Sequence, residues 1–202
     1  MKQQIIFIHG GEAYSNYDVF LECLKNEVID PFEIHTKRWH QKLPVSLGET
    51  YEVFLPKMPN PENAKYLEWK IWFEKYIPFL HDEVILIGHS QGGYFLAKYL
   101  TENMFSISIK ALYLVSAPFE PDDFGGEDGG DFRFDTTQLS KLQENIPRIV
   151  IFHSTDDYVV PYSHALKYKE QMLKAELRTF EDRVHFWQEE FPELVADIKR
   201  LG

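Results

Sequence analysis

The fold is decided by the stretch Val84-Ile85-Leu86-Ile87-Gly88-His89-Ser90-Gln91-Gly92-Gly93, which is followed by an amphipathic segment, residues 94–104. Four β-favouring aliphatic residues before a glycine predict a buried strand, and the apolar spacing of the later segment predicts a helix. Ser90 therefore falls on a turn from strand to helix. This turn is so sharp that the positions two before and two after the serine need almost no side chain, which Gly88 and Gly92 provide. We interpret the stretch as a nucleophile elbow with Ser90 as the nucleophile.

Strands and helices alternate along the rest of the chain. Strands are predicted at residues 5–8, 51–56, 84–87, 110–116, 148–153 and 176–180, and helices at 64–80, 94–104, 162–173 and 192–201, with an earlier helix capped by Ser15 or Asn16. This alternation demands right-handed crossovers and hence a mostly parallel sheet with helices on both faces. The chain has 202 residues and no repeat or linker, so residues 1–202 are predicted to form one domain with a three-layer, doubly wound α/β fold.

Two segments before the elbow carry further expectations. The first helix is expected to turn its apolar residues toward the core, with Cys23 as a buried thiol among them; these residues are Val19, Phe20, Leu21 and Leu24. Residues 30–49 are interpreted as an elaboration rather than a core element, because Pro44 limits any helix through the segment and Gly48 ends it. Within that segment, residues 32–35 fit either a strand or a continued helix.

The composition argues against several classes of protein. Hydrophobic residues make up 44% of the chain, which is too many for a disordered protein, and no apolar run has the length of a membrane span. The net charge of −11 and the scattered basic residues argue against a nucleic-acid-binding surface. Cys23 is the only cysteine, and residues 1–8 lack the apolar length and cleavage site of a signal peptide. We therefore expect a cytoplasmic protein that binds neither nucleic acid nor a membrane.

An acidic, glycine-rich segment lies between residues 120 and 131. Its six carboxylates are Glu120, Asp122, Asp123, Glu127, Asp128 and Asp131. Oxygen ligands on such a backbone suit calcium, but the spacing differs from that of an EF-hand, so a solvated, mobile loop is the favoured interpretation. Its position after the end of a strand also suits a loop that flanks or covers the active site. The chain has no phosphate-binding glycine-rich loop and no closely spaced His and Cys ligands, so neither a cofactor nor a metal is expected.

A nucleophilic serine needs a base, and the base needs an acid that orients it. In this architecture the order along the chain is Ser, acid, His, and each follows a strand, because these loops meet at the carboxyl edge of a parallel sheet. Asp157 lies just beyond the strand predicted at 148–153, and His185 lies between the last strand and the last helix. Asp156 is adjacent to Asp157, and spacing alone does not separate the two.

His185 is favoured as the base among eight histidines. His9 and His89 lie beside glycines near the elbow, where packing or hydrogen bonding is the expected role. Three more precede the acid and are expected at the surface, and two lie at a strand end or in the helix just after the acid; these five are His35, His40, His81, His153 and His164.

These motifs resemble those of the α/β-hydrolases: Gly-His-Ser-x-Gly-Gly from Gly88, an acid four residues before Pro161, and then His-Phe at His185. More narrowly, residues 59–64, Trp69 and residues 82–90 are similar to the small serine hydrolase family that includes retinoblastoma-binding protein 9 and YdeN-type proteins. The resemblance implies an α/β-hydrolase fold without a large cap domain and favours Asp157 over Asp156 as the acid. One departure is Val184, which stands where the family commonly has glycine before the base.

An oxyanion hole needs two backbone N–H donors. Gln91 follows the nucleophile and supplies the first donor. The second is expected after the first strand, where His9-Gly10-Gly11-Glu12 resembles the family's oxyanion loop. We assign it to the Gly11 amide, with Glu12 as the neighbouring alternative.

The sequence thus predicts a cofactor-independent serine hydrolase that cleaves an ester or related small acyl substrate through an acyl-enzyme on Ser90, with Asp157 and His185 completing the triad. One alternative is a non-catalytic member of the fold that binds a protein partner, since a fold does not fix a function. Another is an acyltransferase that uses the same triad.

Overall fold

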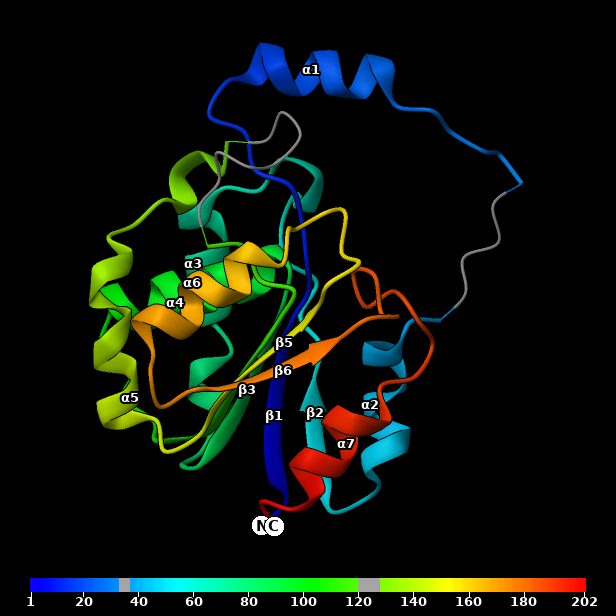
Figure 1. Ribbon diagram of the computed structural model, residues 1–202. Coiled ribbons are helices and arrows are strands. Elements are labelled where there is room, and N and C mark those ends of the chain that lie inside the picture. Colours follow the sequence, from blue (N-terminus) through cyan, green and yellow to red (C-terminus); the bar gives the residue numbers. More distant parts are fainter. Residues whose placement is uncertain (33–36, 120–127) are drawn as a thin grey trace.

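Six parallel strands form the central sheet of the computed structural model, which describes residues 1–32, 37–119 and 128–202 (Figure 1). In the order β2-β1-β3-β4-β5-β6, every neighbouring pair is parallel. The strands are β1 (Gln3–Ile8), β2 (Tyr51–Phe54), β3 (Val84–His89), β4 (Ile109–Val115), β5 (Ile149–Ser154) and β6 (Glu176–Phe180). The predicted doubly wound α/β fold is confirmed, and the described residues contain no large cap.

Alternation along the strands divides the core into two layers. Ile6 and Ile8 of β1 point to one face, and Ile5 and Phe7 point to the other. The first face is covered by α3 (Tyr66–Glu74), α4 (Gln91–Glu102), α5 (Leu142–Asn145) and α6 (Ser163–Gln171). The second face is covered by α2 (Trp39–Leu47) and α7 (Pro192–Lys199). Both faces are apolar because helices bury each of them.

Helix α2 corrects the interpretation of residues 30–49 as an elaboration. It runs through Pro44 to a cap at Gly48, and it buries Trp39, Leu43 and Leu47 against the second face of the sheet. A proline inside a helix costs about 3 kcal/mol. Each large apolar side chain contributes about 1.5–3 kcal/mol when buried, so the three together outweigh the proline. The element expected at residues 32–35 falls outside the described residues, except for Phe32.

Helix α1 (Tyr17–Asn26) contradicts the prediction of an inward apolar face. Asn16 is its cap, since the side chain accepts the Asp18 N–H at 2.8 Å. The helix buries none of its residues: Val19 and Leu24 are exposed and Cys23 is only half-buried. Figure 1 shows α1 beyond the ends of the strands, apart from both helical layers. After β1 the chain runs away from the sheet toward α1 instead of turning back along the sheet (Figure 1).

The helix predicted at residues 64–80 is shorter than expected. Helix α3 ends at Glu74 and a 3₁₀ turn, η2 (Ile77–Phe79), follows. Pro78 explains the break, because it has no N–H to donate to the Glu74 carbonyl. Its inward face consists of Trp69 and Phe73, which are buried, whereas Leu67, Ile71 and Trp72 are exposed.

Short helical segments complete the described chain. They are η1 (Pro61–Asn63), η4 (Gly130–Phe132) and η5 (Thr136–Lys141), the last leading into α5. No element is predicted over residues 136–145, where Leu139 and Leu142 are the only apolar residues and no helical period forms.

The strand order reverses between β1 and β3. The chain passes from β1 to β2 on one side and from β3 toward β6 on the other, so the loops after β1 and β3 diverge. Such a reversal leaves a crevice at the carboxyl edge of the sheet, where ligands bind in open α/β folds. Ser90 and the His9–Glu12 loop both lie at this edge, whereas the two termini lie together at the opposite end (Figure 1).

Candidate active site

Ser90 occupies a strained turn directly between β3 and α4. Its φ is 52° and its ψ is −127°, a conformation that costs a non-glycine residue about 1–3 kcal/mol. Only glycine fits two residues away on either side. A Cβ on Gly88 would lie 2.5 Å from Gly93 Cα, and a Cβ on Gly92 would lie 2.2 Å from the Ile8 carbonyl oxygen. The steric expectation for a nucleophile elbow is therefore met in full.

Asp157 and His185 meet in a buried contact. The Nδ1–H of His185 donates to Asp157 Oδ2 at 2.9 Å and lies 3.2 Å from Oδ1. The N–H groups of Val159 and Val160 also donate to Asp157 Oδ1, at 3.0 and 2.9 Å. Burial acts to raise the Asp157 pKa, but the hydrogen bond and charge of His185 and the Val160 N–H outweigh it, so the pKa lies below its usual value. The charged carboxylate fixes the His185 tautomer and leaves Nε2 to accept a proton.

His185 lies beside the elbow. Its ring centroid is 4.9 Å from that of His89, and His89 Nε2 lies 2.8 Å from the His185 carbonyl oxygen. Among the described residues, the hydrogen bonds of His185 run to Asp157 and His89, and none joins its Nε2 to Ser90 Oγ. In ligand-free enzymes this contact is often long and tightens when substrate binds.

Asp156 points away from the imidazole. Its Oδ1 accepts the Ser154 hydroxyl at 2.5 Å and the Val184 N–H at 2.9 Å. Of the two carboxylates that spacing left open, Asp157 contacts the His185 ring, and Asp156 contacts the backbone just before it. The bond from Asp156 to Val184 joins residues far apart along the chain and was not predicted from the sequence.

A second imidazole reaches Asp157. His153 is completely buried, with Nε2 3.5 Å from Asp157 Oδ2 and 2.8 Å from the Val160 carbonyl oxygen, to which it donates. Burial lowers the His153 pKa against the opposing effects of Val160 and Asp157, so the ring is neutral. A ring sealed from solvent cannot meet a substrate, so of the two imidazoles that reach Asp157, His185 is the candidate base.

The other histidines are held in the fold. His164 is buried, and its Nδ1 accepts the Phe119 N–H at 2.8 Å. His40 was expected at the surface, but it is half-buried and stacks on Phe7 with centroids 4.7 Å apart. Burial, followed by the charges of His9 and Arg38, lowers its pKa to about 4. His81 is half-buried rather than at the surface, and His35 lies outside the described residues.

The loop after β1 passes against the nucleophile. A Cβ on Gly10 would lie 3.1 Å from Ser90 Cβ, and a Cβ on Gly11 would lie 2.6 Å from the Pro61 carbonyl oxygen. His9 braces the loop: its Nε2 accepts the Met58 N–H at 2.9 Å, and its Nδ1–H donates to the Gly10 carbonyl at 2.6 Å. This bracing could not be seen from the sequence, because Met58 is distant along the chain.

The backbone N–H groups of Gly11 and Glu12 are the two candidates for the second donor of the oxyanion hole. The Glu12 N–H donates to the Pro61 carbonyl at 2.7 Å, so it is already engaged. This favours Gly11 over Glu12. The Gln91 N–H lies at the first position of α4, where no helical carbonyl can accept it and where the helix dipole favours negative charge.

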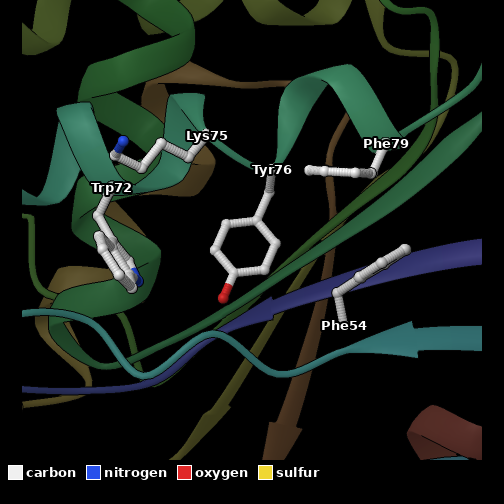
Figure 2. A pocket seen from close by; sticks show the side chains of 5 residues that line it. All are labelled: Phe54, Trp72, Lys75, Tyr76 and Phe79. Atoms are coloured by element: carbon white, nitrogen blue, oxygen red, sulfur yellow. The ribbon is translucent and has the colours of Figure 1, made fainter.

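A separate hollow lies between α3 and β2. It has a volume of about 330 Å³ and is lined by Phe54, Trp72, Lys75, Tyr76 and Phe79. Figure 2 shows the Tyr76 ring between Trp72 on one side and Phe54 and Phe79 on the other. None of these residues belongs to the predicted site.

Part of the acidic segment lies within the described residues. Asp128 accepts the N–H groups of Ser15 and Gly130 at 2.8 and 3.0 Å, and Asp131 accepts the Tyr66 N–H at 2.9 Å. The four other carboxylates of the segment fall in residues 120–127, outside the described part. Within the described part, no group of His, Cys, Asp and Glu side chains has the arrangement of a metal site. No helix there has the length and apolar character needed to cross a membrane.

The chain is similar to known serine hydrolases. A family model described as serine hydrolase matches residues 33–192. The rat serine hydrolase RBBP9 is 30% identical over 153 residues, which cover 75% of this chain and 78% of that protein. Among solved structures, the ydeN gene product of B. subtilis superposes with a TM-score of 0.70 at 18% identity, covering 99% and 98% of the two chains. Est1E from Butyrivibrio proteoclasticus, solved with ferulic acid, has a TM-score of 0.61 at 17% identity and covers 98% and 87%. The two structural likenesses concern the fold.

Proposed function

Because the chain belongs to the serine hydrolase family, we propose that it cleaves carboxylic esters of small acyl compounds through an acyl-enzyme on Ser90. The observation that carries the proposal is the pairing of a strained elbow serine with a buried His185 whose Nδ1–H is fixed by Asp157 at 2.9 Å. A serine in such a turn has its hydroxyl exposed at the end of the sheet, where a base can reach it.

The first half of the reaction forms the acyl-enzyme. His185 Nε2 removes the proton from Ser90 Oγ, and the oxygen attacks the ester carbonyl carbon. The carbonyl oxygen becomes an oxyanion, which the N–H groups of Gln91 and Gly11 bind. As the intermediate collapses, the bond to the alcohol oxygen breaks and His185 returns the proton to the departing alcohol.

The second half releases the acid. Water attacks the acyl carbon while His185 takes its proton, and the proton then passes to Ser90 Oγ as the bond between the acyl group and the serine breaks. Asp157 stays ionised throughout and stabilises the imidazolium, consistent with the lowered pKa of its carboxyl. Each oxyanion donor of this kind contributes roughly 10²–10³-fold to the rate.

The proposal is tested by labelling with a fluorophosphonate, which phosphonylates activated serines. We expect stoichiometric labelling of wild type and none of Ser90→Ala. Absence of labelling in folded wild type, or equal labelling of Ser90→Ala, contradicts the proposal. An unlabelled wild type that retains a stoichiometric protein partner would instead favour the non-catalytic binding function.

A further inference from the structure

The loop that carries His185 is held by three side chains from different parts of the chain. The Val184 N–H donates to Asp156 Oδ1 at 2.9 Å. The His185 carbonyl accepts from His89 Nε2 at 2.8 Å, and the Phe186 carbonyl accepts from Trp39 Nε1 at 2.9 Å. Three consecutive residues are thus each bonded through the backbone, and the middle one is the proposed base.

The backbone of this loop is one that non-glycine residues rarely adopt. Val184 has a φ of 47° and Phe186 has a φ of 53°, so left-handed residues stand on both sides of His185. Unsupported, a β-branched residue such as Val184 would return to negative φ. Any such change rotates the peptide planes next to His185 and swings its ring away from Asp157. The loop therefore depends on its outside contacts for its shape.

Each of the three side chains has the chemistry and the fixed position needed to bond the backbone of the His185 loop. An indole N–H can only donate, and Trp39 is buried with its donor aimed at a carbonyl. His89 is also buried, and it must carry its proton on Nε2 because a carbonyl oxygen only accepts. The rings of Trp39 and His89 pack edge to face, with centroids 6.2 Å apart, so the two donors support each other. Asp156 is itself fixed by the Ser154 hydroxyl, which in turn accepts the Arg183 N–H at 3.1 Å.

We propose that Trp39, His89 and Asp156 are positioning residues that hold the His185 imidazole between Asp157 and Ser90. The inference rests on the proposed function, because it concerns the base of that reaction. It also explains how the loop keeps its shape with Val184 in place of glycine. Glycine would adopt the left-handed conformation at position 184 without strain, whereas with valine the hydrogen bonds from α2, the elbow and the loop after β5 hold that conformation.

The test compares Trp39→Phe with the matched control Tyr113→Phe. Each variant keeps an aromatic ring and deletes one buried donor, and the Tyr113 hydroxyl bonds Asp197 Oδ2 at 2.8 Å, away from the His185 loop. Two quantities are measured in each: the second-order rate constant for fluorophosphonate labelling, and the downfield proton resonance of the His185 Nδ1–H. The resonance reports the bond to Asp157 whether or not the protein turns over a substrate.

We expect Trp39→Phe to be labelled about 10-fold to 100-fold more slowly than wild type, with a broadened or shifted resonance, because a displacement of about 1 Å suffices for such a loss. Tyr113→Phe should match wild type in both. Equal rates and resonances in Trp39→Phe and Tyr113→Phe would overturn the inference.

A second pair of variants serves if Trp39→Phe does not fold. Asp156 is exposed, so Asp156→Ala should fold and should show the same slow labelling and altered resonance, whereas Asp156→Asn keeps an acceptor oxygen and should restore both. Equal labelling rates and equal resonances in Asp156→Ala and Asp156→Asn would count against the inference. If wild type is not labelled at all, the proposed function fails, while the resonance still decides whether these residues position the imidazole.

Discussion

His89 Nε2 lies 2.8 Å from the backbone oxygen of His185, so the residue immediately before the elbow serine holds the residue that carries the proposed base. The hydrogen bond ties the turn after β3 to the loop after β6, two segments at the carboxyl edge that are distant in the sequence. Through it, the elbow that carries Ser90 and the loop that carries the imidazole are linked directly.

The two adjacent carboxylates should respond differently to loss of charge. Asp157→Asn should lower kcat/KM on a p-nitrophenyl ester roughly 10³–10⁴-fold, because an amide neither selects the His185 tautomer nor stabilises the imidazolium. Asp156→Asn should stay within about threefold of wild type, since its amide oxygen can still accept the Val184 N–H. The reverse order of the two effects would exchange the roles of Asp156 and Asp157.

Position 184 should prefer glycine to alanine. At a φ of 47°, alanine keeps the left-handed strain and glycine does not, so Val184→Gly should be about 1 kcal/mol more stable than Val184→Ala. Val195 in helix α7 provides the control: inside a helix alanine is favoured over glycine, so Val195→Ala should be more stable than Val195→Gly. Urea unfolding of the four variants measures both differences. An alanine variant at 184 as stable as the glycine variant would mean that the loop carries no such strain.

The half-buried His40 should make the protein less stable in mild acid. Burial lowers its pKa from 6.5 to about 4, so between these values the unfolded chain binds more protons than the folded chain. The free energy of unfolding therefore rises with pH across this window and levels off above it. His89 and His153, whose pKa values burial also lowers, act in the same direction.

His40→Phe retains an aromatic ring against Phe7. In this variant the free energy of unfolding should rise less steeply with pH than in wild type, but it should still rise. Urea denaturation at several pH values between 4 and 7 tests this. An unchanged rise in His40→Phe would show that the ring is not shielded from protonation in the folded state.

The glycines of the fold should differ sharply in tolerance. Gly92→Ala places a Cβ 2.2 Å from the Ile8 carbonyl oxygen, a backbone atom that cannot move aside, so we expect a loss of more than about 4 kcal/mol and little folded protein. In Gly48→Ala the added Cβ has no atom within 4 Å, so the only cost is the strain of an alanine at a φ of 90°. We expect the free energy of unfolding to fall by about 1–2 kcal/mol. Thermal unfolding and soluble yield distinguish them. Similar melting temperatures for both variants would contradict the packing at the elbow.

The sheet and the elbow were predictable because they depend on local sequence. Unbroken apolar runs such as Val84–Ile87 mark strands that are buried on both faces, and the glycines around Ser90 mark a turn that other residues cannot make. Places after strands predicted His185 and left Asp156 and Asp157 as alternatives, since parallel strands bring those loops to one edge. The choice of Asp157 came from the resemblance to the α/β-hydrolases. Each of these signals lies within a few residues of the feature that it predicts.

What the sequence did not reveal depends on contacts between distant segments. Trp39, Leu43 and Leu47 are spaced four apart, a pattern that favours a helix, and their burial against the sheet outweighs the break expected at Pro44. The outward course of α1 depends on where the chain leaves β1, which no local pattern encodes. The bonds from Trp39, His89 and Asp156 to the His185 loop join residues brought together only by the finished fold.

Formation of an acyl-enzyme on Ser90 can be detected by acid-quenched mass spectrometry of the protein mixed with p-nitrophenyl acetate. We predict one acetyl group on the peptide that carries Ser90, formed in wild type and absent in Ser90→Ala. Ester hydrolysis that continues at the wild-type rate in Ser90→Ala, or turnover with no acetyl group on Ser90, would contradict it.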